Sequence, residues 1–150
     1  MRKIIVTVLN LVNLVLLGIT FGLGSLTAAT NASGNSVGTY YSLVWPSSNA
    51  YFNALNLIAF FGLCVAAALA FFLLVPVKFR KFVSAGAAAL LIFVGVLTLL
   101  IPANYASVAE VAPALTLEGG LIAMGVLLFV AALLTCFGAV LEFLPEKEAK

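Results

Sequence analysis

Four asparagines are the residues best placed to do chemistry inside the apolar parts of this chain. The motif NLVN carries Asn10 and Asn13, and the motif NALN carries Asn53 and Asn56. Residues three apart are neighbours on a helix surface, and an amide that faces hydrocarbon is costly, so each pair should face protein or water. We expect two separate clusters, because the pairs fall at different depths along their helices. They favour hydrogen bonds between helices, and the alternative is a polar lining for a transported substrate.

Catalytic and metal-binding patterns are absent from the sequence. The chain has no His and no Asp, which removes the commonest general base and the commonest transition-metal ligand. It contains no phosphate-binding loop, no dinucleotide fingerprint and no nucleophile with a His partner. Cys64 and Cys136 lie in apolar runs and are interpreted as buried small residues. We therefore expect no enzyme activity, no metal and no cofactor.

The acidic residues form no obvious site. Glu110 and Glu118 are interpreted as a solvated charge and a helix cap, and the alternative is a carboxylate pair that binds a cation or shuttles protons. Glu142 falls near the end of the last apolar segment, close in sequence to Lys147. No acidic residue lies in the middle of an apolar segment, so the usual mark of a pump is missing.

Composition places the chain in lipid. It is 65% hydrophobic and only 8% charged, whereas soluble domains are about 25% charged. The net charge of +2 comes from scattered basic residues and gives no field for nucleic acid. The lipid bilayer is therefore the first expected partner.

The apolar residues fall into four segments, at about 4–28, 50–77, 82–101 and 119–143. Each is long enough for a helix to cross the hydrocarbon, so the sequence predicts an all-α four-helix transmembrane bundle in one domain, residues 1–150. The first segment is longer than a signal-peptide core and is interpreted as a retained helix. Pro76 and Pro102 are expected to end helices, and Thr116 with Glu118 is expected to cap the fourth helix.

All seven basic residues fall on one side of such a bundle: Arg2 and Lys3, then Lys78, Arg80 and Lys81, then Lys147 and Lys150. The loops at 29–50 and 102–118 contain none. The positive-inside rule therefore puts both termini in the cytoplasm and the two longer loops outside. We expect the membrane to be the plasma membrane.

Small residues mark expected contacts between helices. Gly18 and Gly22 have GxxxG spacing in the first segment, and Gly86 and Gly125 lie in the third and fourth. Small residues let helix backbones approach closely in lipid. We expect them to pack the bundle on itself, and the alternative is that one such face docks a partner helix.

The first outer loop is uncharged and aromatic. Its first half, which is rich in Ser, Asn and Gly, favours turns. Its second half, TYYSLVW, favours a short hairpin or an extended strand. The rings at Tyr40, Tyr41, Trp45 and Tyr51 suit the headgroup level of a membrane, or they form a surface that binds a partner protein. Asn31-Ala32-Ser33 is an N-glycosylation sequon.

The topology resembles that of small tetraspan proteins such as claudins. Those proteins carry a Gly-Leu-Trp and two-cysteine motif in the first outer loop, whereas SLVW supplies only Trp45 here and the loop has no Cys. The resemblance extends to topology alone and transfers no residue roles.

These observations predict a non-catalytic accessory or structural subunit of a membrane complex, bound to other subunits or to itself. One alternative is a small transporter or channel component whose asparagines line a path. Another is a subunit of a membrane enzyme whose cofactor is held by a neighbouring chain.

Overall fold

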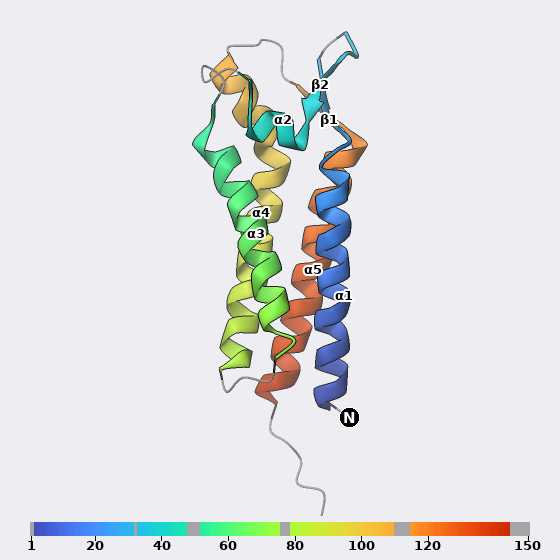
Figure 1. The fold of residues 1–150 in the computed structure, drawn as a ribbon, viewed down its shortest axis with the longest axis vertical. Coiled ribbons are helices and arrows are strands. Elements are labelled where there is room, and N and C mark those ends of the chain that lie inside the picture. Colours follow the sequence, from blue (N-terminus) through green and yellow to red (C-terminus); the bar gives the residue numbers. More distant parts are fainter. Residues whose placement is uncertain (1, 32, 48–51, 76–78, 110–114, 145–150) are drawn as a thin grey trace, which may run out of the picture.

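Four long helices form the body of the protein. The structure, a computed structural model, describes residues 2–31, 33–47, 52–75, 79–109 and 115–144. In that part of the chain, four helices are long and apolar enough to cross a membrane: α1 (Arg2–Leu23), α3 (Ala54–Phe72), α4 (Arg80–Ala109) and α5 (Gly119–Phe143). They stand side by side, as Figure 1 shows. The predicted four-helix bundle is confirmed at this level.

A small sheet covers one end of the bundle. It contains β1 (Thr27–Thr30), β2 (Ser36–Thr39) and β3 (Thr116–Leu117) in the order β2-β1-β3, and both pairings are antiparallel. The short helix α2 (Tyr40–Val44) follows β2 directly, and Figure 1 shows it lying across the same end. We call this end, formed by the sheet and α2, the sheet end. The all-α prediction is therefore incomplete, and β1 also pairs with a strand from the second loop. The hairpin or strand predicted for TYYSLVW is wrong, because Thr39 caps a helix over Tyr40–Val44 and the hairpin lies earlier in the loop.

Helix α1 ends at residue 23, not at the predicted residue 28. Three successive turns follow, with the NH groups of Gly24, Ser25 and Leu26 donating three residues back, before the chain becomes β1. At Gly24 a Cβ atom would lie 2.8 Å from Cζ of Tyr41. The ring of Tyr41 thus occupies the space beside the end of α1, and glycine is required there.

Helix α3 spans 54–72, so the predicted 50–77 is too long in the described part. The side chain of Asn53 caps its start by accepting from the NH of Leu55 at 2.8 Å, which satisfies a backbone donor that has no partner in the helix. At the other end, Leu74 and Val75 donate to carbonyls three residues back. Residues 50, 51, 76 and 77 lie outside the described residues, and so does the predicted stop at Pro76.

Helix α4 does not stop before Pro102 as predicted; it runs through this proline to residue 109. An interior proline removes a backbone hydrogen bond and normally costs about 3 kcal/mol. Here Ile101 and Pro102 are both buried, and Asn104 on the next turn is bonded to α3. Packing at the sheet end therefore offsets the cost.

Helix α5 has the predicted bounds, but its start is built differently. Glu118 occupies the capping position without bonding the helix by its side chain, and Thr116 lies in β3. The Glu118 carboxylate instead accepts from the hydroxyl of Thr30 at 2.9 Å. The backbone NH of Glu118 donates to the carbonyl of Ala28 at 3.1 Å. Glu118 is therefore the N-cap residue as predicted, although its side chain does not cap the helix, whereas Thr116 takes no part in the cap because it pairs with β1.

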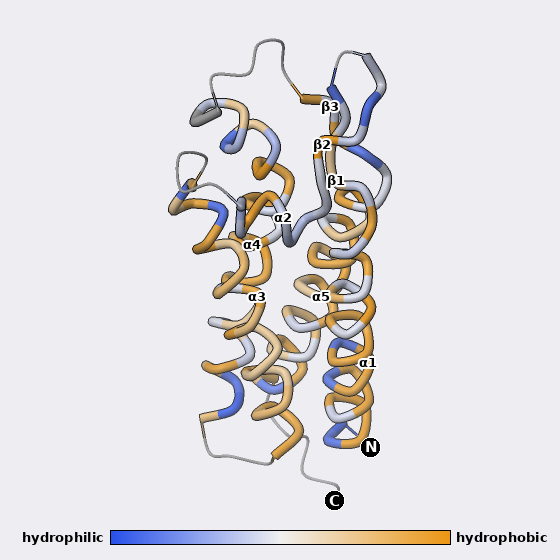
Figure 2. Tube along the Cα trace, turned by 45° about the horizontal axis from the view of Figure 1, so that its top comes forward, coloured by the Kyte–Doolittle hydropathy of each residue, from blue (hydrophilic) through white to orange (hydrophobic). Residues whose placement is uncertain are grey.

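The helices do not contact one another equally. Helix α5 packs along both α1 and α4, and α3 packs mainly on α4, whereas α1 and α3 have the fewest contacts of these neighbours. Figure 2 shows hydrophobic residues along the helices, with hydrophilic ones concentrated toward the two ends. Many large apolar side chains point outward, as a lipid environment requires.

Candidate functional site

Three asparagines join α3 to α4 near the sheet end. Asn56 is fully buried and donates to the carbonyls of Leu43 and Ile101 at 3.3 and 3.4 Å. Asn104 donates to Oδ1 of Asn56 at 3.2 Å, and Asn53 donates to the carbonyl of Asn104 at 3.0 Å. We call Asn53, Asn56 and Asn104 the sheet-end amide cluster. Its amides bond one another and the backbone, so it acts as a connection between α2, α3 and α4.

The other asparagine pair lies further from the sheet and is also buried. Asn10 donates to the carbonyl of Leu73 at 3.1 Å, which ties α1 to the end of α3. Asn13 donates to the hydroxyl of Thr135 on α5, and Thr135 donates in turn to the carbonyl of Ala131. Oδ1 of Asn13 has no hydrogen-bond partner among the described residues. This pair therefore bonds different partners from those of the sheet-end amide cluster.

An ion pair closes the opposite end of the bundle. Nε of Arg80 lies 2.9 Å from the carboxylate of Glu142, and both side chains are mostly buried. Ser84 also donates to this carboxylate at 3.3 Å, and Arg2 donates to the carbonyl of Leu144 at 2.6 Å. Charges at this end therefore join the starts of α1 and α4 to the end of α5.

The loop aromatics have three different roles. Tyr40 is fully buried and its hydroxyl has no partner among the described residues, so it offers no surface to another protein. Tyr41 donates to the carbonyl of Phe21. Trp45 is 51% exposed and contacts Phe60 and Phe61 edge to face. Of the predicted partner-binding residues, only Trp45 is therefore exposed, and Tyr51 lies outside the described residues.

Burial changes the acidity of two of these rings. Desolvation raises the pKa of the Tyr40 hydroxyl well above its usual value, with smaller effects from Tyr41 and Cys64. Desolvation also raises the pKa of Tyr41, and Cys64 adds to the effect. Both hydroxyls are therefore held in the neutral form, which is poorly suited to acid–base chemistry near neutral pH.

The predicted small-residue contacts divide in two. Gly125 is required by packing, because a Cβ there would lie 2.6 Å from Cδ2 of Leu99 on α4. Gly18, Gly22 and Gly86 are exposed, and a Cβ on any of them would meet nothing within 4 Å. Packing of the bundle on itself is therefore the wrong explanation for these three glycines.

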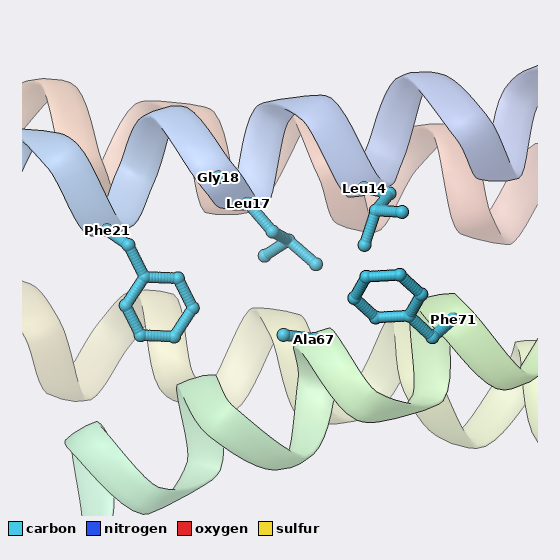
Figure 3. A pocket seen from close by; sticks show the side chains of 6 residues that line it. All are labelled: Leu14, Leu17, Gly18, Phe21, Ala67 and Phe71. Carbon is cyan, nitrogen blue, oxygen red and sulfur yellow. The ribbon is translucent and has the colours of Figure 1, made fainter.

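An apolar cleft of about 220 Å³ lies between α1 and α3, and we call it the α1–α3 cleft. Figure 3 shows its lining and the side chains that project into the gap. The lining residues are Leu14, Leu17, Gly18, Phe21, Ala67 and Phe71. The cleft lies between α1 and α3, which contact each other less than α5 contacts α1 or α4 and less than α3 contacts α4.

Several structural partners were missed from the sequence. Asn104 was assigned to a loop because Pro102 was expected to end the helix, and Thr135 was not distinguished from its apolar neighbours. The pairing of Arg80 with Glu142 needs the register of α4 against α5, which no local pattern carries. The cysteines are both free, and neither is buried as predicted, since Cys64 is half-buried and Cys136 is exposed.

These features define the class: a four-helix bundle suited to a membrane, with a three-stranded sheet over one end. Among the described residues, no group of three or more His, Cys, Asp or Glu side chains could hold a metal ion. No family model, curated protein or solved structure matches the chain.

Proposed function

We propose that this protein is a non-catalytic accessory or structural subunit of a membrane protein complex, which binds its partners at the sheet end. Its termini face the cytoplasm of a plasma membrane, and the sheet end faces out. The distribution of basic residues supports this orientation. The main support for the role is the hairpin between β1 and β2, which Figure 1 shows projecting beyond the helices.

Hydrogen bonds connect the described residues of the hairpin tip, 31 and 33–35, to one another. Oδ1 of Asn31 accepts from the NH groups of Ser33 and Asn35, both at 3.0 Å. Gly34 has φ of 76°, a left-handed conformation that glycine adopts without strain. Residues 33–36 are all exposed. The tip is thus preorganised and uncharged, and preorganisation lowers the entropy cost of binding a partner.

Interior polar groups support a structural role over a catalytic one. Each of the four predicted asparagines donates to a named oxygen of the chain, and Arg80 and Glu142 bond each other. These groups are occupied in holding the helices together. The surface that remains for function is then the outside of the molecule, and the projecting tip is its most distinct polar part.

Native mass spectrometry of the protein, extracted gently from its own membrane, tests the proposal. We expect a defined hetero-complex that Ser33→Glu disrupts and that Ala103→Glu leaves intact. Both residues are exposed, but Ala103 lies on α4 away from the hairpin. A lone monomer or a homo-oligomer would overturn the accessory role. A hetero-complex that survives Ser33→Glu would overturn the hairpin as the contact.

The transporter alternative keeps one specific observation in its favour. Asn13 is 2% exposed and its Oδ1 atom lacks a partner among the described residues, so it could accept from a molecule that passes through the bundle. Flux in liposomes would then be abolished by Asn13→Leu. Equal flux in liposomes with and without the protein would remove this alternative.

A further inference from the structure

The α1–α3 cleft has the shape of a hollow between two aromatic rings. In Figure 3 the side chains of Phe21 and Phe71 project into the gap from opposite helices, one toward each end of the cleft. Between them the lining includes Gly18 and Ala67, the smallest side chains of the set. Glycine at position 18 leaves this space open, because a Cβ there would meet nothing within 4 Å.

The position of the cleft places it against hydrocarbon. Its α1 residues, Leu14 to Phe21, lie in the half of α1 nearer the sheet, whereas Ala67 and Phe71 lie in the half of α3 farther from it, so the cleft lies near the middle of the bundle's length. Gly18 is exposed and Phe71 is 61% exposed, so the cleft opens sideways from the bundle. The neighbouring outward side chains Val15 and Ile19 are apolar and exposed. The cleft is therefore continuous with the surface that a bilayer would cover.

Water and a partner helix are poor occupants. A buried water needs two to four polar partners, whereas the six lining side chains have none. A helix laid along the gap would meet the rings of Phe21 and Phe71. A flexible, unbranched hydrocarbon chain meets neither objection.

We propose that the α1–α3 cleft binds an acyl chain of a membrane lipid. The chain enters sideways, passes between the two phenylalanine rings and contacts α1 and α3 together. It thereby fills the gap where these helices have few contacts of their own. This inference does not depend on the accessory role, because a lipid can occupy the cleft whatever binds at the sheet end.

The test uses the full chain, purified and placed in phosphatidylcholine nanodiscs that contain a phosphatidylcholine with a photoactivatable diazirine on its acyl chain. Crosslinked residues are identified by peptide mass spectrometry. We expect a yield at the cleft residues of α1 and α3 at least threefold above that at Val126 and Leu133, which are exposed apolar residues of α5. The reference positions report ordinary contact with bulk lipid.

Two leucine substitutions separate the cleft from the rest of α1. Gly18→Leu fills the cleft and should bring its yield down to the α5 level, whereas Gly22→Leu, one turn away and outside the lining, should leave the excess unchanged. Neither Cβ meets an obstacle within 4 Å, and equal helical circular dichroism verifies folding. Ala67→Leu fills the cleft from α3 and should act like Gly18→Leu. No excess in the wild type, or an excess that survives both filling variants, would overturn the proposal.

Discussion

At the scale of single residues, the amides in the bundle act mainly by satisfying one another. Asn56 is the centre of this arrangement, since it bonds the carbonyls of Leu43 and Ile101 and accepts from Asn104. A leucine of similar size cannot make any of these bonds. The network therefore depends more on Asn56 than on the outer member Asn53.

We expect Asn56→Leu to lower the free energy of unfolding by about 1–3 kcal/mol, because it leaves buried polar groups unsatisfied. Denaturant titration of the purified protein in detergent micelles measures the change. Asn35→Ala at the exposed hairpin tip is the control and should change stability by less than about 0.5 kcal/mol. Equal stability of the wild type and Asn56→Leu would mean that water already satisfies these groups.

The adjacent residues Tyr40 and Tyr41 lead to opposite predictions for the effect of removing a hydroxyl on stability. The Tyr41 hydroxyl donates to Phe21, so Tyr41→Phe should destabilise the protein by about 0.5–1.5 kcal/mol. The Tyr40 hydroxyl is buried and lacks a partner among the described residues, and burying an unbonded hydroxyl is costly. Tyr40→Phe should therefore leave stability unchanged or raise it. Thermal unfolding of the two variants tests both predictions. A larger loss of stability from Tyr40→Phe than from Tyr41→Phe would contradict the hydrogen bonding described for the two hydroxyls.

At the scale of elements, the contact between α4 and α5 depends on a missing side chain. Gly125 faces Leu99, and a Cβ at position 125 would approach Cδ2 to 2.6 Å. Gly86 also lies within a helix but faces open space. Close packing against a neighbouring helix thus explains the glycine at position 125 but not the glycine at position 86.

We expect Gly125→Ala to destabilise the protein by about 1–3 kcal/mol through overpacking. Gly86→Ala should stabilise it by about 0.4–1 kcal/mol, because alanine has less freedom to lose in a helix. Combining Gly125→Ala with Leu99→Ala should recover part of the loss, since the obstacle is then removed. Denaturant titration of the wild type, Gly86→Ala, Gly125→Ala, Leu99→Ala and the double variant tests this, and additive effects of Gly125→Ala and Leu99→Ala would argue against direct contact.

The bounds of the helices and strands show which elements could be predicted from the sequence. Helix α5 was predicted with its full bounds because polar residues flank an uninterrupted apolar run. The end of α1 was not predicted correctly, since it depends on the Tyr41 ring that lies beside Gly24. The continuation of α4 past Pro102 was also missed, since it depends on bonds between Asn104 and α3. Strand β3 is two residues long and forms only by pairing with β1. Each failure involves residues distant in sequence, which local patterns do not record.

At the scale of the whole molecule, charge and architecture agree on two distinct ends. The described basic residues Arg2, Lys3, Arg80 and Lys81 all lie on the helix ends opposite the sheet. The sheet end has one described carboxylate, Glu118, and no described basic residue. Basic residues are retained on the cytoplasmic side of membranes, so this asymmetry predicts one orientation.

Cysteine labelling tests this orientation in intact cells. In a background with Cys64→Ala and Cys136→Ala, Ser33→Cys at the hairpin tip should react with a membrane-impermeant maleimide before lysis. Lys3→Cys, at the other end of α1, should react only after the membrane is opened. The tip is the better probe because residues 33–36 are exposed and contribute no side chain to the core. The opposite pattern would put the sheet in the cytoplasm, where a preorganised uncharged hairpin could meet only intracellular partners.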